Sequence, residues 1–416
     1  MSLIRHIQFL KDVFFYTLSA FGGPQSHLGL IQKKFVQKKK YISDTELLEY
    51  YSFCQLLPGA TSTQLIALVG YKRGGLLLSI LTLLVWITPA CFLMGLLSFI
   101  VTESNNKELT LSLFKYIQPM TIGFLIYSAA KTFQISIKNT ITQIIMLFSL
   151  TICYLLFKSP WVFPLIIILG GVITNFSDKR IPEKEYIKPR QIRWTNILLF
   201  LFIFLIAGFL SESARTNQWK NRKAFNLFEN FYRFGGVVFG GGDILLPMML
   251  DQYVARPNDP KLKEKNPNAI KIEKSEILTG YGLVRAIPGP VFSVGSYVGG
   301  LALEKEGKKS QLLGCLIGSI AIFLPGSLLL FFFFPVWQNL KKFVVVYRAL
   351  EGINAVVVGI IWAAALFLIS GMMDNGNSRE LILDIAIIIS TFLFLNYTTL
   401  PAPVWVLVCV LSGFFF

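Results

Sequence analysis

The sequence predicts an all-α polytopic membrane protein, and three observations carry that prediction. Of the 416 residues, 54% are hydrophobic and 15% are charged, whereas soluble domains carry about 25% charged residues. Residues 75–101, 195–211 and 312–336 contain no charged side chain. Each of these stretches is long enough for a spanning helix, which needs roughly 17 to 25 residues. The sequence lacks the alternation of apolar and polar positions that is typical of a membrane β-barrel.

Charged residues and Gly/Pro clusters divide the chain into apolar segments. These segments start near residues 8, 46, 75, 112, 140, 160, 195, 224, 276, 309, 345, 380 and 401. Several carry glycine and proline in the middle, where a simple helix is weakened or broken. Such broken segments either span the membrane fully or enter and return as hairpins, and the sequence leaves both open.

Positive charge gathers between the apolar segments, as in the loop 33–40. The chain has 39 Lys and Arg against 23 Asp and Glu, a net charge of +16. Loops beside anionic lipid headgroups have this composition, so we expect membrane lipid as a partner. We expect no nucleic acid, because no basic and aromatic surface remains outside the spans.

The sequence contains no recognisable catalytic or cofactor motif. Metal-spaced His and Cys clusters, a phosphate loop and a Ser/His/Asp set in local context are all missing. The five cysteines lie in apolar segments without paired spacing, which is typical of small buried thiols. We therefore predict no enzyme activity, no metal and no cofactor, and a carrier driven by a gradient.

The chain consists of two similar halves. FGGPQSH at residue 21 recurs as FGGGDIL at residue 239, LPGATSTQ recurs as IPGPVFSV, and ITPA recurs as FLPG, always in the same order. We predict an N-terminal repeat (1–176), a basic linker with a connecting helix (177–223) and a C-terminal repeat (224–416). Each repeat has six segments. One unpaired helix between them turns the second repeat upside down, which is the inverted-repeat architecture of many secondary transporters. The amino terminus and the linker are then cytoplasmic, and the carboxyl terminus is outside.

Each half carries a Pro–Gly turn inside an apolar segment. A helix stops there and a new one can begin, with Pro290 suited to a first helical position in the second half. The free N–H groups and positive dipole at a helix start can hold an anion, and we expect the two starts to converge on one anion near the midplane. The alternative is a proline kink that only bends a span. The predicted substrate-binding residues are Gln55, Pro58, Gly59, Thr61, Thr63, Gln64, Arg285, Pro288, Gly289, Pro290 and Ser293.

Two glycine clusters predict further helix breaks around a cavity, or close helix packing instead. These clusters are Phe21-Gly22-Gly23 and Phe239-Gly240-Gly241-Gly242.

Ionisable residues within the membrane are costly and mark functional sites. Arg285 is suited to bidentate binding of a tetrahedral oxyanion, or to a structural salt bridge. Asp243 is a proton-coupling carboxylate, the partner of Arg285, or a solvated helix cap. His27 is a second candidate for proton coupling, or a satisfied polar residue at a helix end. Capping of helix N-termini accounts for Glu46 and Glu276.

The ordered motifs FGGPQSH, QLLPGATSTQ, FGGGDILLP and AIPGPVFSVGSYVGG resemble those of the long-chain chromate ion transporter family, over essentially the whole chain. The resemblance implies a protein of the bacterial cytoplasmic membrane that exports chromate, using the proton motive force. Two departures concern the substrate: Ala60 stands where the family commonly has proline, and Arg285 where we expect glutamine. An anion channel, or a transporter of sulfate or another anion at the same half-helix site, is the alternative. A homodimer is left open.

Overall fold

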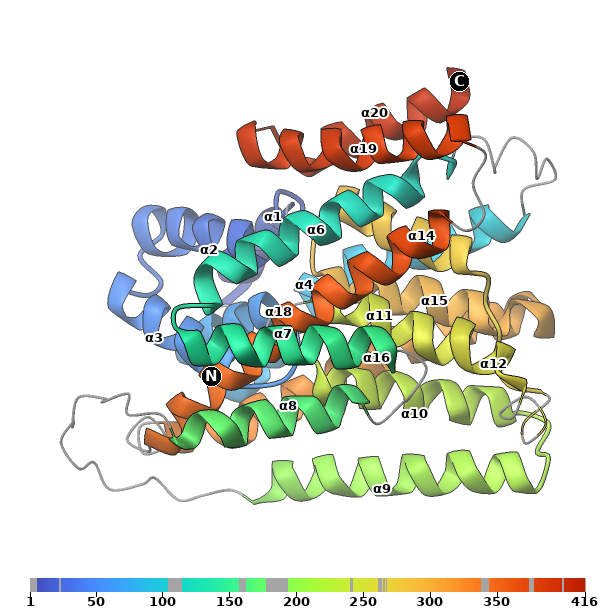
Figure 1. Ribbon diagram of the computed structural model, residues 1–416. Coiled ribbons are helices and arrows are strands. Elements are labelled where there is room, and N and C mark those ends of the chain that lie inside the picture. Colours follow the sequence, from blue (N-terminus) through green and yellow to red (C-terminus); the bar gives the residue numbers. More distant parts are fainter. Residues whose placement is uncertain are drawn as a thin grey trace.

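The computed structural model describes residues 6–21, 24–103, 114–156, 162–176, 194–239, 242–260, 264, 266, 268–337, 344–373, 378–398 and 400–415. Every regular element in these ranges is a helix (Figure 1). Five helices are long and apolar enough to cross a membrane: Thr61–Thr102, Thr195–Thr216, Lys308–Phe333, Arg348–Met373 and Glu380–Tyr397. The prediction of an all-α, multi-pass membrane protein is confirmed.

The helices follow one another in three groups. The first half comprises α1 (Ile7–Thr17), α2 (Pro24–Ile31), the π-helix η2 (Gln32–Lys38), α3 (Asp44–Gln55), α4 (Thr61–Glu103), α6 (Ile117–Ser136), α7 (Thr140–Leu155), α8 (Val162–Ile173) and η3 (Thr174–Phe176). Helix α9 (Thr195–Thr216) stands between the halves. The second half comprises α10 (Arg222–Val237), η4 (Gly242–Ile244), α11 (Leu245–Leu250), the π-helix η5 (Asp251–Ala255), α12 (Arg256–Asn258), α14 (Lys274–Leu283), η6 (Val284–Ala286), η7 (Val291–Ser293), α15 (Val294–Leu303), η8 (Glu304–Glu306), α16 (Lys308–Phe333), η9 (Phe334–Val336), α18 (Val344–Met373), α19 (Ser378–Tyr397) and α20 (Ala402–Phe415).

The first Pro–Gly turn is the tip of a helical hairpin. Helix α3 leads to the turn and the first part of α4 leads back, so that Lys72 forms an ion pair with Glu46 at the open end. That pair lowers the pKa of the Glu46 carboxyl. A capping box with Ser43 starts α3, which confirms the capping role predicted for Glu46. The return arm has 13 residues, about 20 Å at helical rise, and is too short to cross a hydrocarbon core of about 30 Å.

Helix α4 then reverses at a glycine pair. Gly74 (φ −153°) and Gly75 (φ +72°) are not helical, and the second part of α4 folds back against the first. The Ser79 hydroxyl donates to Ala67 O at 2.6 Å. The part after Gly75 is therefore the membrane span, in agreement with the charge-free stretch predicted to begin there.

The second half repeats this arrangement. Helices α14 and α15 form the hairpin, with the Tyr297 hydroxyl donating to Glu276 O at 3.2 Å. Glu276 also completes a capping box at the start of α14, as predicted. After Gly307 (φ +99°), α16 returns along α15 as the span. A Cβ on Gly318 would lie 1.9 Å from Gly295 O, so small residues let the backbones of these two helices touch.

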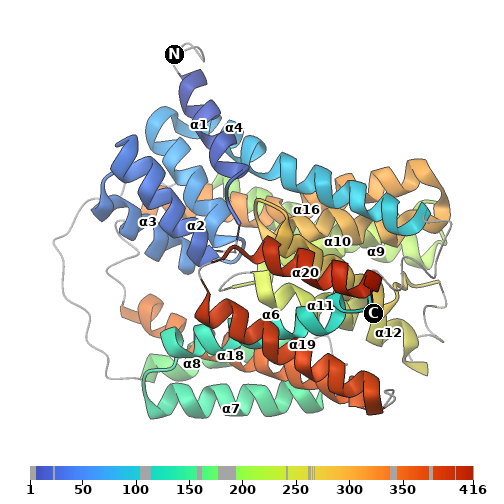
Figure 2. The same cartoon turned by 90° about the horizontal axis from the view of Figure 1, so that it is seen from above.

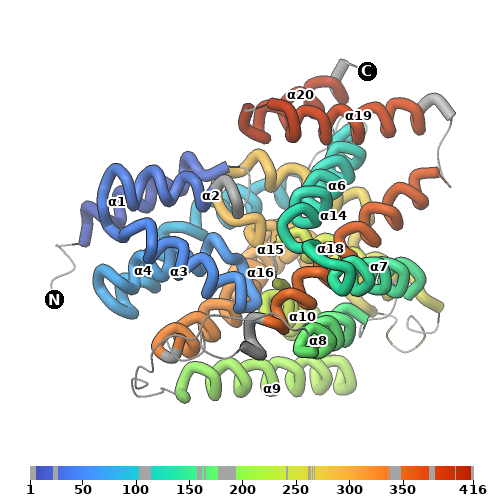
Figure 3. Tube along the Cα trace, turned by 60° about the vertical axis from the view of Figure 1, so that its left-hand side comes forward, coloured from blue at the N-terminus to red at the C-terminus, as the bar shows by residue number. Residues whose placement is uncertain are grey.

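The remaining helices form a second bundle and an outer helix. Figure 2 shows α6, α7, α8, α18 and α19 gathered on one side of the molecule, so both halves contribute to this bundle. In Figure 3, α9 lies on the outside, opposite α19 and α20. Of its most apolar 18-residue window, 17% is buried, as expected for a helix that faces lipid.

Candidate functional site

Each hairpin tip is docked on the opposite half of the chain. The N–H of Gly59 donates to Val238 O at 2.7 Å, and the N–H of Gly289 donates to Ala20 O at 2.9 Å. Ala20 and Val238 directly precede the two glycine clusters. The two bonds are therefore repeat-related, and each couples the Pro–Gly turn of one half to the predicted helix break of the other.

Both tips need glycine for two reasons. Gly59 has φ +120° and Gly289 has φ +127°, in the region that L side chains rarely adopt. A Cβ on Gly59 would lie 3.2 Å from Gly326 Cα, and one on Gly289 would lie 2.7 Å from Ala90 Cβ. Gly326 and Ala90 directly follow Pro325 and Pro89, the prolines of the two repeated motifs. Each tip thus lies against the long span of the opposite half.

The predicted polar residues of the first tip serve mainly to hold it. Gln64 Nε2 donates to Pro58 O at 2.8 Å, while its buried Oε1 has no partner in the described part of the chain. Thr63 Oγ1 accepts a hydrogen bond from Trp86 Nε1 at 3.0 Å. Thr61 is buried at the start of α4, and Gln55 is partly exposed at the end of α3.

His27 lies beside the second tip's docking point. Its Nε2 is 3.2 Å from Ala20 O, the same oxygen that accepts from Gly289. The side chain is 1% exposed, and no described residue is a partner of Nδ1. Phe21 and Phe239 are partly exposed beside the breaks. Gly22, Gly23, Gly240 and Gly241 lie outside the described residues.

One prediction for the second tip is wrong in detail. Pro290 is extended (ψ 137°) and precedes the helical turn as its N-cap, whereas the sequence suggested a first helical position. The reason is that the turn opens as a 3₁₀-helix, with Ser293 N donating to Pro290 O at 3.0 Å. Pro288 remains inside the tip, as predicted.

The structure brings Asp243 and Arg285 into direct contact. Arg285 Nη2 donates to Asp243 Oδ1, and the two side chains are 10% and 14% exposed. This is the partner of Arg285 that the sequence suggested. Gly242, the residue before Asp243, packs against the second tip. A Cβ on Gly242 would lie 2.8 Å from Val291.

Three residues of this site were not predicted from the sequence. Ser128 on α6 donates to Asp243 Oδ2, and the Tyr281 hydroxyl donates to Gly242 O. The Arg285 guanidinium lies 5.6 Å from the ring centre of Phe124 and 5.6 Å from that of Tyr281. Ser128 is one of several polar residues of α6, so the sequence alone does not single it out.

The site presents donors that described residues leave unused. Arg285 Nε and Ser293 Oγ are buried without a partner in the described ranges. Both can donate to an anion, and a buried polar group is stabilised when it gains such a partner. Within the residues that the structure describes, no three His, Cys, Asp or Glu side chains are grouped to hold a metal ion.

The chain resembles known proteins along most of its length. It is 24% identical to an uncharacterised transporter of Methanocaldococcus jannaschii. That match extends over 356 residues and covers 83% of this chain and 80% of the relative. It is 22% identical to a chromate transport protein of Cupriavidus metallidurans, over 84% of this chain and 79% of the relative. A probable chromate transport protein of Synechococcus elongatus is also 22% identical, over 95% and 92% of the two chains. No solved structure matches.

A family model described as chromate transporter matches residues 7–175 and again residues 225–414. The two matches hold the two hairpins and the residues that dock them, and the interval between them includes α9. Because the matches cover most of both halves, the chain belongs to the chromate transporter family.

Proposed function

We propose that this protein is a secondary active transporter that exports a tetrahedral oxyanion, chromate first, across a bacterial cytoplasmic membrane. Membership of a family of ion transporters and the printed names of two relatives support the substrate class. The observation that carries the proposal is the reciprocal docking of the two Pro–Gly tips. Backbone breaks inside a membrane protein are tolerated where they line a cavity, and paired breaks near the midplane are the sites of many carriers.

The same contacts support an inverted arrangement of the halves. The backbone hydrogen bond of each tip and its close approach to the opposite span have repeat counterparts at the other tip, as expected for a two-fold relation between the halves. In Figure 1, α2 and α3 lie at one end of the molecule and α12 lies at the other. Two equivalent hairpins that enter from opposite sides would let one central site open to either side in turn.

Asp243 and Arg285 supply a route for coupling to protons. In the empty site the carboxylate neutralises the guanidinium. An oxyanion offers the same oxygen acceptors as a carboxylate, so it would take the place of Asp243. The released carboxylate would then be unpaired in a poorly solvated site, where protonation is favoured. A dianion that leaves with this one proton still carries a net negative charge, so the electrical part of the proton motive force, negative inside the cell, would drive it outward. Arg285 Nε and Ser293 Oγ would complete the donor set.

Uptake of chromate into inverted membrane vesicles tests this proposal. We expect saturable uptake that depends on the membrane potential of energised vesicles, which is positive inside and draws in the net negative load. Arg285→Ala should weaken binding by about 2 to 5 kcal/mol, the loss typical of a charge-assisted pair, and Arg285→Gln should weaken it less. Asp243→Asn should leave binding intact and remove its pH dependence. Lys138→Gln, at an exposed lysine of the loop after α6 that donates to Gln134 O, serves as the control.

Two outcomes would contradict the proposal in different ways. Rapid flux without saturation or gradient dependence would indicate an anion channel. Normal binding by Arg285→Ala, with a lower yield of folded protein, would make Arg285 a structural ion-pair member. Competition by sulfate at the chromate concentration would assign a broader oxyanion specificity to the same site.

A further inference from the structure

A polar cavity lies away from the hairpin tips. It has a volume of about 420 Å³ and lies where α9 ends, α10 begins and α12 passes. Five cationic side chains line it: Arg215, Arg222, Lys223, Arg233 and Arg256. Two acidic side chains, Glu212 and Glu229, line it as well. The lining therefore has an excess of positive charge, although Glu306 and Asp251, which do not line the cavity, pair with Lys223 and Arg256.

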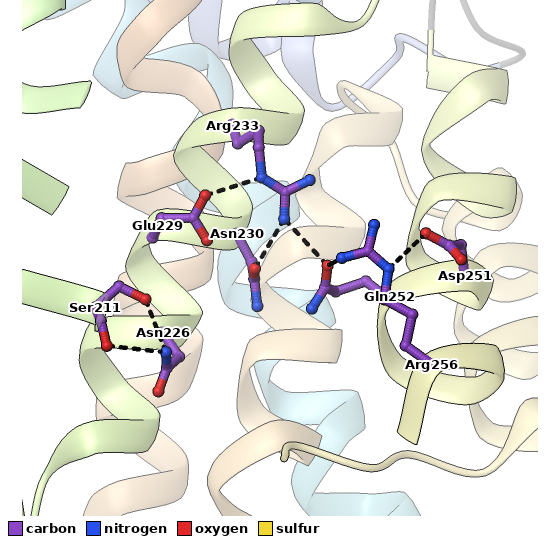
Figure 4. A network of polar contacts seen from close by, with 8 residues as sticks. All are labelled: Ser211, Asn226, Glu229, Asn230, Arg233, Asp251, Gln252 and Arg256. Carbon is purple, nitrogen blue, oxygen red and sulfur yellow. Dashed lines mark hydrogen bonds and ion pairs between the residues drawn. The ribbon is translucent and has the colours of Figure 1, made fainter. Parts of the chain in front are cut away.

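Two arginines converge in this cavity from different elements (Figure 4). Arg233 Nη2 on α10 and Arg256 Nη1 on α12 both donate to Gln252 Oε1, at 3.1 and 2.8 Å. The two nitrogens are thus no more than about 6 Å apart. Two like charges at this distance repel each other when poorly solvated. The carboxylates of Glu229 and Asp251 offset part of this repulsion, and an anion between or above the two arginines would relieve the rest.

The network fixes both guanidinium groups and still leaves donors free. Arg233 Nε donates to Glu229 at 2.8 Å, and Arg256 Nε donates to Asp251 at 2.9 Å. Arg233 also donates to Asn230 at 2.9 Å. The remaining terminal nitrogen of each arginine has no partner among the described residues, and in Figure 4 neither contacts another residue drawn. Such a prearranged pair of planar donors suits an oxyanion.

The position of the cavity connects it to the transport site. Arg233 lies five residues before Val238, about 7 Å along the helix, and Val238 accepts the bond from the first hairpin tip. Helix α10 therefore leads from the cationic cavity, which Arg222 and Arg233 line, to the glycine break that follows Val238. An anion held in the cavity is close to the element that the central site is built on.

The first half has a comparable cationic base. Its π-helix η2 carries Lys34 and Lys38, and Lys39 pairs with Asp12 of α1 at 3.0 Å. The π-helix η5 of the second half lies at the equivalent position of the repeat. Positive charge at the base of both hairpins is what a path for anions requires at its two mouths.

We propose that the cavity between Arg233 and Arg256 binds a second tetrahedral oxyanion and serves as a vestibule for the central site. The ion is either free, of the transported class, or the phosphate of an anionic lipid headgroup, since both present the same oxygens. The proposal rests on the proposed function only for the role of vestibule. Binding to the cavity itself is independent of it.

Radiolabelled sulfate, measured by equilibrium dialysis on the full chain in nanodiscs of neutral phosphatidylcholine, tests the proposal. We expect the wild-type protein to bind two sulfates and Arg233→Gln/Arg256→Gln to bind one. Glu229→Gln/Arg233→Gln removes both members of an ion pair, so it leaves no unpaired buried charge that could prevent folding. It should weaken sulfate binding to the cavity at least tenfold. Lys220→Gln is the control, because Lys220 is exposed in the loop between α9 and α10 and does not line the cavity. This variant should still bind two sulfates.

The lipid arm repeats the measurement in nanodiscs with phosphatidylglycerol. If the headgroup occupies the cavity, the wild-type count falls to one while that of Arg233→Gln/Arg256→Gln does not change. Unchanged sulfate binding by both cavity variants in both lipids would overturn the proposal. If Arg285→Ala binds as many ions as wild type while the cavity variants lose one, the central site fails and the cavity site stands.

Discussion

Gly289 shows how a single residue sets the geometry of the central site. Its N–H reaches Ala20 O at 2.9 Å because the backbone adopts φ +127°. Any side chain there is strained and also meets Ala90. The sequence predicted a turn at this position. It did not predict that the turn docks on the other half, since the two bonded residues are far apart in the chain.

We expect Gly289→Ala to impair chromate uptake much more than Gly307→Ala. Both glycines have positive φ, but a Cβ on Gly307 would meet no atom within 4 Å. The control thus isolates backbone strain, about 1 to 3 kcal/mol, from displacement of the docked tip. Uptake per folded molecule in vesicles is the measurement. Equal loss in the two variants would mean that the docking contact is dispensable.

Among the elements, the crossing of α15 and α16 depends on small residues. Gly295 and Gly299 of α15 face Gly318 and Gly314 of α16, with hypothetical Cβ atoms within 3 Å of the opposite backbone. Helices in membranes associate through such close packing, since lipid offers no hydrophobic driving force between them. This crossing joins the second hairpin to its span.

Gly318→Ala should therefore lower the thermal stability of the purified protein. Overpacking of this kind lowers the free energy of unfolding by about 1 to 3 kcal/mol or more. Gly208→Ala on α9 is the matched control, because a Cβ there meets nothing within 4 Å. Scanning the unfolding of both variants in the same detergent provides the comparison. If Gly318→Ala unfolds at the same temperature as the control, the two helices are not in contact as described.

At the scale of the whole molecule, an inverted repeat places equivalent loops on opposite sides of the membrane. Exposed Gln37 at the end of η2 and exposed Asn258 at the end of α12 occupy comparable places in the two halves. The native cysteines are free and buried, so a background without them is needed only to remove residual labelling.

Single cysteines at Gln37 and Asn258 should accordingly differ in their reaction with an impermeant thiol reagent in intact cells. One should label at once and the other only after the membrane is opened. Labelling of both in intact cells would place both loops outside and rule out inversion. Labelling after permeabilisation serves as the control for reactivity.

The sequence by itself determined the helical class, the three charge-free spans, the two halves and the four motifs around the site. These follow from local properties: apolar segment length, charge between segments, and glycine and proline inside them. It also identified Asp243 as a candidate partner of Arg285, because a charge in the membrane needs a neighbour of opposite sign.

Only the tertiary structure decided what each motif contacts. It assigned Val238 to Gly59 and Ala20 to Gly289, added Ser128 and Tyr281 to the site, and brought Arg233 and Arg256 to one amide oxygen. These contacts join residues distant in sequence and depend on how the helices pack. Hydrophobicity fixes which segments enter the membrane, whereas hydrogen bonds and close backbone approach fix how they meet.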